Sequence, residues 1–160
     1  MDVRITRLDP AVPLPEYQTA GAAGFDLASA ADMTIQPGEV ALVPTGLVIA
    51  VPAGHFLGIF ARSSTPLKRG LMVANGVGVV DSDYCGAADE VRIEVLNFTT
   101  RPVTVARGDR LAQGVVLACA RVVWREAGAD GRPDRGGFGG TDRPATSPDP
   151  APRQPAPEPQ

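Results

Sequence analysis

The stretch Gly78-Val79-Val80-Asp81-Ser82-Asp83-Tyr84-Cys85-Gly86 joins an apolar run to a short acidic turn. The apolar run extends from Leu71 to Val80, and a second run rich in Val and Ile begins at Glu90. Glycine, aspartate and serine supply tight-turn geometries, whereas Val and Ile favour strands. We therefore predict a β-hairpin with two carboxylates and a tyrosine at its mouth. Such a turn is either an ordinary solvated connection or a place where a carboxylate serves as a base beside a flat binding surface.

The composition of the whole chain predicts a single all-β domain. At 160 residues the chain is long enough to bury an ordinary core, and its 18 glycines and 16 prolines leave few windows for a helix. A net charge of −3 argues against a protein that coats nucleic acid. The two cysteines form no metal-ligand spacing, and no apolar run reaches the roughly 18 residues of a membrane-spanning helix. These features predict a cytoplasmic protein without nucleic-acid or membrane partners.

Short apolar runs separated by turn residues recur along the chain up to Trp124. The alternation of apolar and polar side chains is clearest in Val91–Phe98. We predict strands within Val3–Leu8, Met33–Pro44, Gly46–Pro52, Phe56–Ala61, Leu71–Val80, Val91–Phe98, Thr99–Arg107 and Val115–Trp124.

Four further stretches carry polar residues that could bind a ligand. Thr19–Leu27 is a small-residue turn with Asp26 at a strand entrance, Arg62–Gly70 combines an arginine with hydroxyls and two more cations, and Gly108–Gln113 leads into an apolar run. Arg135–Thr141 is rich in glycine around one phenylalanine. Each also has an ordinary interpretation: turn capping, a basic surface loop, a turn entering a strand, and a low-complexity linker, respectively.

Together with Gly78–Gly86, these stretches resemble, in order, the five sequence blocks of the trimeric dUTP pyrophosphatases (dUTPases). The blocks are A-G-x-A-G-Y-D-L, P-R-S-G-L-A-x-K-x-G, G-V-I-D-x-x-Y-x-G, G-D-R-I-A-Q and a C-terminal R-G-x-G-G-F-G-S-T. This chain departs from them at Phe25 (for Tyr), Ala61 (for Pro), Ser64 (for Gly), Thr65-Pro66 (for Leu-Ala) and Gly140 (for Ser), and the last block is shortened before Phe138.

The resemblance implies a fold and a reaction. The fold is a jelly-roll-like β-barrel (β-clip) with a flexible C-terminal arm, assembled as a homotrimer whose active sites are shared between subunits. The reaction is the Mg²⁺-dependent cleavage of dUTP to dUMP and pyrophosphate, which limits uracil incorporation into DNA and supplies dUMP for dTMP synthesis. On this basis we expect a β domain in residues 1–125, a Gly-rich arm carrying the substrate lid in 126–143 and a Pro-rich disordered tail in 144–160.

The resemblance also assigns roles to residues. Asp81 takes the place of the general base that activates the attacking water, and Tyr84 lies against the deoxyribose and excludes a 2′-hydroxyl. Asp26 would contact Mg²⁺ through water. The expected substrate-binding residues are Arg62, Ser63, Ser64, Asn75, Gly78, Val80, Tyr84, Gln113, Arg135, Gly137, Phe138 and Gly139.

Two other functions are compatible with parts of this pattern. Arg62-Ser63-Ser64 also resembles the R-S-S of dCTP deaminases, in which a glutamate placed like Glu94 is catalytic, so a deaminase or a bifunctional enzyme is one alternative. A non-catalytic nucleotide-binding relative is another. Asp81-Ser82-Asp83-Tyr84 differs from the D-P-G-W of deaminases, and Glu94 is also explained as an ion-pair partner of Arg92 or Lys68.

Overall fold

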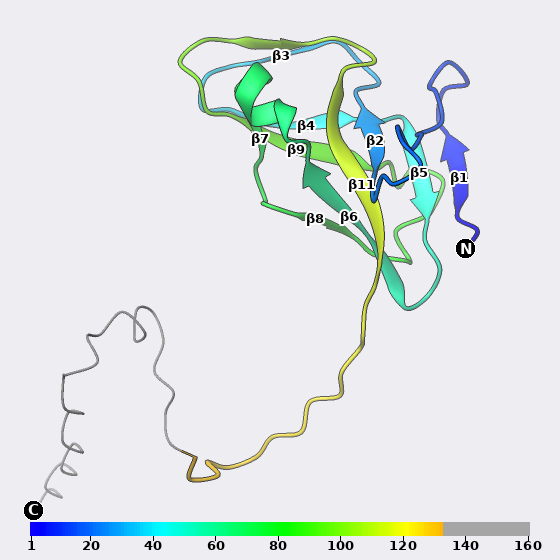
Figure 1. Ribbon diagram of the computed structural model, residues 1–160, viewed down its shortest axis with the longest axis vertical. Coiled ribbons are helices and arrows are strands. Elements are labelled where there is room, and N and C mark those ends of the chain that lie inside the picture. The colour runs from blue at the N-terminus through cyan, green and yellow to red at the C-terminus, as the bar shows by residue number, and fades with distance from the viewer. Residues whose placement is uncertain (133–160) are drawn as a thin grey trace, which may run out of the picture. The chain divides into compact units, whose positions relative to one another are not determined.

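The computed structural model describes residues 1–132 and contains eleven β-strands and one short π-helical segment within them. Residues Met1–Val122 form one compact unit, and a second unit begins at Val123. The eleven strands of the described residues all belong to the first unit, which bears out the all-β prediction (Figure 1). Their bounds are β1 Arg4–Arg7, β2 Phe25–Ala28, β3 Met33–Ile35, β4 Val40–Pro44, β5 Leu47–Ala50, β6 His55–Ala61, β7 Leu71–Val73, β8 Gly78–Val80, β9 Arg92–Asn97, β10 Val103–Val105 and β11 Arg110–Ala118, with the segment η1 at Thr65–Arg69.

A four-stranded antiparallel sheet of order β2-β11-β6-β8 carries most of the residues expected at the site. Strand β11 is the longest and runs between β2 and β6 (Figure 1). Its pairing with β6 is regular from Ala112 opposite Ala61 to Ala118 opposite His55. The pairing with β2 shifts register between Arg110 and Ala112, which marks a β-bulge at Leu111.

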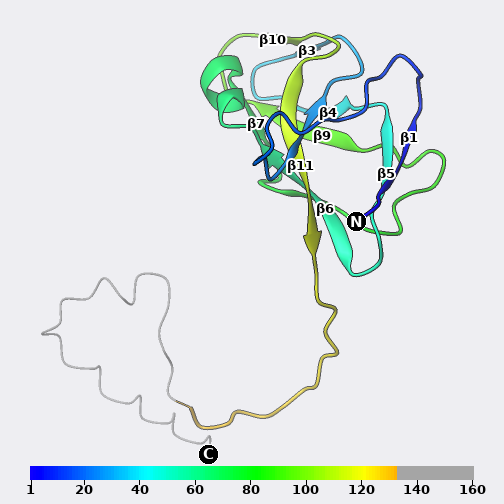
Figure 2. The ribbon, with the colours of Figure 1, turned by 45° about the vertical axis from the view of Figure 1, so that its right-hand side comes forward.

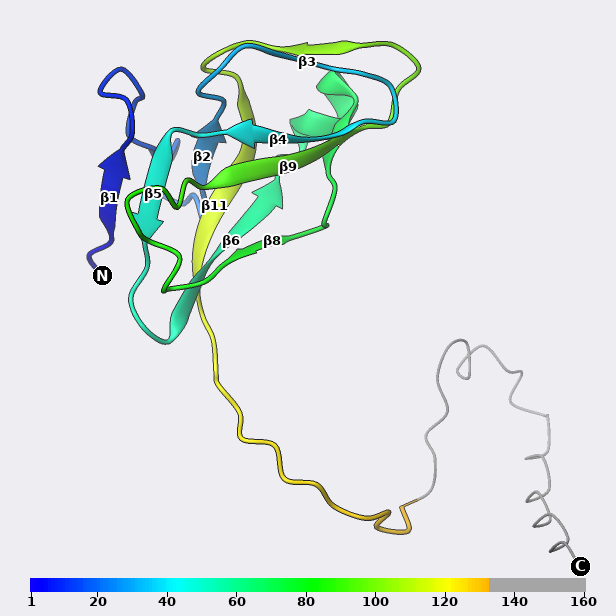
Figure 3. The ribbon, with the colours of Figure 1, turned by 180° about the vertical axis from the view of Figure 1, so that it is seen from behind.

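The remaining strands form a three-stranded sheet, β4-β9-β7, and two strand pairs, β1-β5 and β10-β3. Seen from behind, β4 and β9 run side by side in front of β6 and β11 (Figure 3). The antiparallel strands β1 and β5 lie side by side in Figure 2. Because successive side chains of a strand point to opposite faces, each sheet turns one apolar face inward. These faces form one continuous core, in which side chains such as Leu27, Leu57, Ile93 and Leu111 are fully buried.

The predicted hairpin at Asp81 is wrong. Strand β8 pairs with β6, whereas β9 pairs with β4 and β7, so residues 81–91 connect two different sheets. A hairpin and a sheet-to-sheet connection have the same local composition of turn residues between apolar runs. Only the partners that each strand finds in the folded chain distinguish them.

Three predicted strands are divided or displaced in the structure. A turn with a left-handed glycine divides Met33–Pro44 at Gly38 (φ 74°), and another divides Leu71–Val80 at Gly76 (φ 73°). The last strand begins five residues earlier than predicted, at Arg110, and ends at Ala118. Trp124 is 89% exposed, so the final apolar residues of the predicted strand contribute nothing to the core.

Within the expected loop Arg62–Gly70, residues Thr65–Arg69 form the π-helical segment η1. It is anchored where the buried Thr65 hydroxyl donates to the Leu111 carbonyl oxygen at 2.7 Å. It ends at Gly70, whose left-handed conformation (φ 66°) and close approach to Thr99 leave no room for a side chain. In residues 1–132 no helix is long and apolar enough to cross a membrane.

Candidate functional site

Asp26 on β2 is held between two arginines. Arg62 Nε lies 2.8 Å from Asp26 Oδ1, and Arg110 NH1 lies 3.0 Å from Asp26 Oδ2. The Asp26 side chain is only 12% exposed, so one carboxylate largely shielded from water faces two guanidinium groups. The local excess of positive charge is suited to an anionic ligand.

Strand pairing explains how residues from distant parts of the sequence meet here. Gln113 on β11 stands opposite both Asp26 on β2 and Phe60 on β6, and its side-chain Nε2 donates to the Ala61 carbonyl oxygen at 3.3 Å. Arg62 follows directly at the end of β6. The sheet thus brings together three of the predicted residues: Asp26, Arg62 and Gln113.

The residues after Arg62 continue this site into η1. Ser63 is exposed, and Ser64 is the N-cap residue of η1 with no hydrogen bond from its side chain to the helix backbone. The backbone N–H of Thr65 donates to the Arg62 carbonyl oxygen at 3.0 Å, which closes a turn around the two serines. This turn presents two hydroxyls and an arginine from one short segment, the kind of donor set that binds phosphate.

The Asp81 turn holds a second group of predicted residues. The Tyr84 backbone N–H donates to the Asp81 carbonyl oxygen at 3.2 Å, and the Tyr84 hydroxyl donates to the Glu90 carbonyl oxygen at 3.3 Å. Asp81 is exposed and Tyr84 is 42% exposed, so both residues are accessible to a ligand. The nearby Asn75 is exposed, Gly78 is buried, and Val80 is half-buried at the end of β8.

The two groups lie at opposite ends of β6 within one chain. Val80 pairs with Leu57, whereas Arg62 lies five residues further along the same strand direction. At about 3.3 Å per residue the separation is roughly 16 Å. A single chain therefore does not bring Asp81 next to Arg62 and Asp26.

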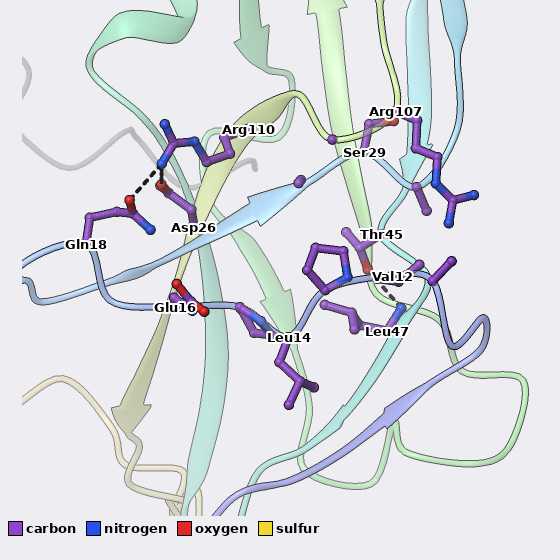
Figure 4. Close-up of a pocket in the computed structure, with 16 residues that line it drawn as sticks. Val12, Leu14, Glu16, Gln18, Asp26, Ser29, Thr45, Leu47, Arg107 and Arg110 are labelled. Carbon is purple, nitrogen blue, oxygen red and sulfur yellow. Dashed lines mark hydrogen bonds and ion pairs between the residues drawn. The ribbon is translucent and has the colours of Figure 1, made fainter.

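A pocket of about 500 Å³ lies beside the Asp26 cluster, lined in part by the N-terminal connector from Ala11 to Gln18. In Figure 4, Gln18 and Arg110 point toward Asp26 at one end, and Arg107 stands at the other. Gln18 Oε1 accepts a hydrogen bond from Arg110 NH1 at 2.9 Å. Arg107 is engaged elsewhere, 2.8 Å from Asp9 Oδ2.

Gln18 and Arg110 were not among the predicted site residues. Arg110 stands in the Gly108–Gln113 block, but alternation from Gln113 would place it on the opposite side of the strand. The bulge at Leu111 reverses that expectation. Gln18 carries no local signal, because only the folded connector brings it to the sheet.

An ion pair at the end of η1 stabilises the loop that carries the serines. Arg69 donates from NH1 and NH2 to the two carboxylate oxygens of Asp109, at 2.5 and 2.8 Å. Asp109 also accepts from the Ala106 backbone N–H at 2.9 Å. The hydrogen bonds from Arg69 hold the pKa of Asp109 below its ordinary value.

Glu94 stands apart from both groups. It lies half-buried on β9 in the other sheet, opposite Leu42 on β4. Arg92, the partner suggested for it, instead pairs with Glu90 at 3.2 Å, so that expectation is wrong for Arg92. Within residues 1–132 of one chain, Glu94 therefore lies outside the two groups of site residues.

The residues present fit a magnesium ion held mainly by the substrate. No group of three or more His, Cys, Asp or Glu side chains converges anywhere in residues 1–132. Asp26 uses one acceptor direction on each oxygen for an arginine, which leaves the others for metal-bound water. Mg²⁺ keeps several waters and is commonly held by substrate phosphates with one or two carboxylates.

The expected residues Arg135, Gly137, Phe138 and Gly139 lie outside the described part of the chain.

Comparison with known proteins identifies the family. The dUTPase family model matches residues 11–141. The deoxyuridine 5′-triphosphate nucleotidohydrolase of Rhizobium meliloti is 48% identical over 134 residues, covering 80% of this chain and 82% of the relative. That of Methylocella silvestris is 43% identical over 136 residues, covering 81% and 83%. The crystal structure of dUTPase from Streptococcus mutans superposes with a TM-score of 0.70 at 33% identity, covering 78% of this chain and all of that one. The antiparallel architecture and the order of the five sequence blocks therefore have one explanation: this chain belongs to the dUTPase family.

Proposed function

We infer that this protein hydrolyses dUTP to dUMP and pyrophosphate, and thereby limits uracil incorporation into DNA and supplies dUMP. The observation that carries this inference is the cluster of Asp26, Arg62 and Gln113, which joins residues of three separate dUTPase blocks at one end of one sheet. Family membership supplies the reaction, and the arginines of the cluster supply positive charge that suits a triphosphate.

The triphosphate would bind at the Arg62 end of the sheet. Arg62, Ser63, Ser64 and Gln113 provide side-chain donors, and the π-helical turn keeps the serines beside the arginine. From the C-terminal arm, Arg135 would reach the terminal phosphate and Phe138 would cover the uracil ring, with Gly137 and Gly139 providing backbone contacts. Fixing both ends of the substrate in this way makes attack on the α-phosphorus effectively intramolecular.

Asp81 would act as the general base. Its carboxylate accepts a proton from the water that attacks the α-phosphorus, as the bond to the leaving pyrophosphate breaks. Tyr84 is held by its hydrogen bond to the Glu90 carbonyl and presents its ring to the deoxyribose, leaving no space for a 2′-hydroxyl. Asn75, Gly78 and Val80 would line the uracil site, largely through backbone groups.

Mg²⁺ would bind phosphate oxygens and water, with Asp26 accepting hydrogen bonds from that water. When bound, it would neutralise charge on the triphosphate and the departing pyrophosphate. The role of Asp26 itself is to orient the hydrated triphosphate while keeping Arg62 in place.

The separation between Asp81 and Arg62 in one chain supports an active site shared between subunits of a homotrimer. An apolar surface for such contacts is present on the β4-β9-β7 sheet, where Val40, Leu42 and Met72 share one face and are 54%, 52% and 43% exposed. Monomeric proteins rarely leave such a patch in water, because burying it against another copy is favourable.

Product analysis tests the function directly. The protein and Mg²⁺ are incubated with dUTP and with dCTP in separate reactions, and the nucleotides are separated by chromatography. We expect dUMP and pyrophosphate from dUTP, and unchanged dCTP. Conversion of dCTP to dUTP or dUMP would instead support a deaminase and direct attention to Glu94. No reaction with either nucleotide would support a binding protein.

A further inference from the structure

We propose that Arg110, oriented by Gln18, is a positioning residue that keeps Arg62 free to bind the substrate triphosphate. This role rests on the dUTP hydrolysis proposed above. Neither residue need touch the substrate. Arg110 acts through the carboxylate of Asp26, which it shares with Arg62, and Gln18 acts through Arg110.

The bulge at Leu111 is what allows Arg110 to take part. Ala112 stands opposite Leu27, but Arg110 stands opposite the next residue, Ala28, so Leu111 is an extra residue in β11. Leu111 and Ala112 are both fully buried as a result. In a regular strand without the bulge, Leu111 would pair with Ala28, and Arg110 would project to the face opposite that of Gln113. The bulge turns Arg110 onto the face that carries Asp26.

The hydrogen bonds of Arg62 show what this arrangement achieves. Its Nε contacts Asp26 Oδ1, and its NH1 donates to the backbone carbonyl oxygen of Arg110 at 3.1 Å. These contacts hold the guanidinium at Nε and NH1 and so restrict the orientation of its plane. A fixed guanidinium edge is a ready donor for a phosphate oxygen.

Removing the Arg110 side chain would change how Asp26 and Arg62 interact. Asp26 Oδ2 would lose its partner, and a free carboxylate pairs with guanidinium through two parallel hydrogen bonds. Asp26 would then rotate to engage Arg62 with both oxygens, withdrawing donors from the triphosphate. Arg110 therefore limits the ion pair between Asp26 and Arg62 to one carboxylate oxygen.

Gln18, in the N-terminal connector, holds the Arg110 side chain in place. Its side-chain oxygen receives a hydrogen bond from the same NH1 atom that donates to Asp26 (Figure 4). Arg110 is 47% exposed and would otherwise sample several conformations in water. Gln18 restricts it to the one that faces Asp26.

The test compares Arg110→Ala, Gln18→Ala, the double variant and the control Arg107→Ala in the full-length chain. Arg107 lines the same pocket but pairs with Asp9, so its loss leaves the Asp26 cluster intact. For each variant, KM and kcat for dUTP are measured, together with calorimetric affinity for a non-hydrolysable dUTP analogue and the Tm.

We expect Arg110→Ala to raise KM and the analogue Kd about tenfold, with kcat changed less than about threefold. Gln18→Ala should raise both about threefold, and the double variant should be no worse than Arg110→Ala, because Gln18 acts only through Arg110. Arg110→Lys should recover part of the affinity, since it restores one donor to Asp26. Arg107→Ala should match the wild type.

Wild-type affinity in Arg110→Ala would overturn the proposal, as would additive effects in the double variant or an equal loss in Arg107→Ala. If Arg110→Ala lowers the Tm severely, the Gln18→Ala variant still tests the proposal, because Gln18 is exposed and its loss should not unfold the domain. A higher KM at an unchanged Tm in Gln18→Ala would support a positioning role, and a wild-type KM would overturn it. Analogue binding without hydrolysis by the wild type would refute the proposed function while leaving the positioning role testable.

Discussion

At the scale of single residues, the proposed function makes Asp81 the side chain on which turnover should depend most. It is exposed at the end of β8, and its backbone carbonyl is fixed by the N–H of Tyr84. Asp81→Asn keeps this backbone geometry but removes the proton acceptor. We expect kcat to fall by about 10²–10⁴-fold while the affinity for a non-hydrolysable analogue changes little.

The neighbouring acid provides the matched control. Asp83 is also exposed in the same turn, so Asp83→Asn makes the same chemical change two residues away. It should retain most of the activity. Equal losses in the two variants would show that the charge of the turn matters, and not a base at Asp81.

A second residue-scale prediction concerns Asp109. Its pKa is lowered in the folded protein, chiefly by the hydrogen bonds from Arg69, so the ionised form contributes stability at neutral pH. That contribution is complete above the unfolded pKa of about 3.9 and is lost as the pH falls toward the folded pKa. Asp109→Asn should therefore cost about 1 kcal/mol at pH 7, allowing for solvent screening, and less below pH 4.

Denaturant unfolding at both pH values measures this difference. Asp130→Asn is the control, because Asp130 also pairs with an arginine, Arg132, but outside the Met1–Val122 unit and with both side chains exposed. It should leave the free energy of unfolding unchanged. A loss in Asp109→Asn that is independent of pH would contradict the ion-pair explanation.

At the scale of elements, β11 depends on a glycine at its centre. A Cβ on Gly114 would lie 2.5 Å from the ring of Phe25 and 3.1 Å from Leu57. Both neighbours are buried, so neither ring nor side chain can move away without opening the core. We expect Gly114→Ala to destabilise the domain by about 1–3 kcal/mol.

Thermal or urea unfolding measures the effect. Gly128→Ala is the matched control, since nothing lies within 4 Å of a Cβ at that position. It should unfold like the wild type. A Gly114→Ala variant of unchanged stability would mean that β2 and β6 pack less tightly on β11 than the structure indicates.

The C-terminal arm is the other element that the proposed function requires. Deleting residues 135–160 removes Arg135 and Phe138 but none of the eleven strands described in residues 1–132. We expect kcat/KM for dUTP to fall by about 10²-fold or more, with the unfolding midpoint unchanged. Deleting only residues 144–160 should leave activity intact, and equal activity in both truncations would show that the arm has no catalytic role.

At the scale of the whole molecule, the roughly 16 Å between the two groups of site residues predicts complementation between inactive subunits. Asp81→Asn and Arg62→Gln each disable one group. Suppose that every site takes Asp81 from one subunit and Arg62 from another. When equal amounts of the two variants exchange subunits at random, about one quarter of all active sites then contain both intact residues. Mixing the two variants under subunit-exchange conditions should therefore restore about 25% of wild-type kcat.

The controls are each variant exchanged with itself, which should remain inactive, and size-exclusion chromatography with light scattering to establish trimers. Absence of recovery in verified mixed trimers would place both residues of a site in the same subunit.

The amino-acid sequence by itself determined the all-β class, the family and the polar residues of each block. These features are local: alternation in Val91–Phe98 requires only neighbours two residues apart, and the turn residues near Asp81 specify a bend by their own backbone preferences. Asp26, Arg62 and Gln113 were identifiable because each lies inside a recognisable block.

Tertiary structure alone decided which strands pair and which residues meet. Local composition could not show that β8 pairs with β6 and not β9, because strand partners are selected by core packing across the whole domain. Nor could it reveal Gln18 and Arg110 beside Asp26, since one meets the site through a folded connector and the other through a bulge that shifts the alternation of β11 by one residue.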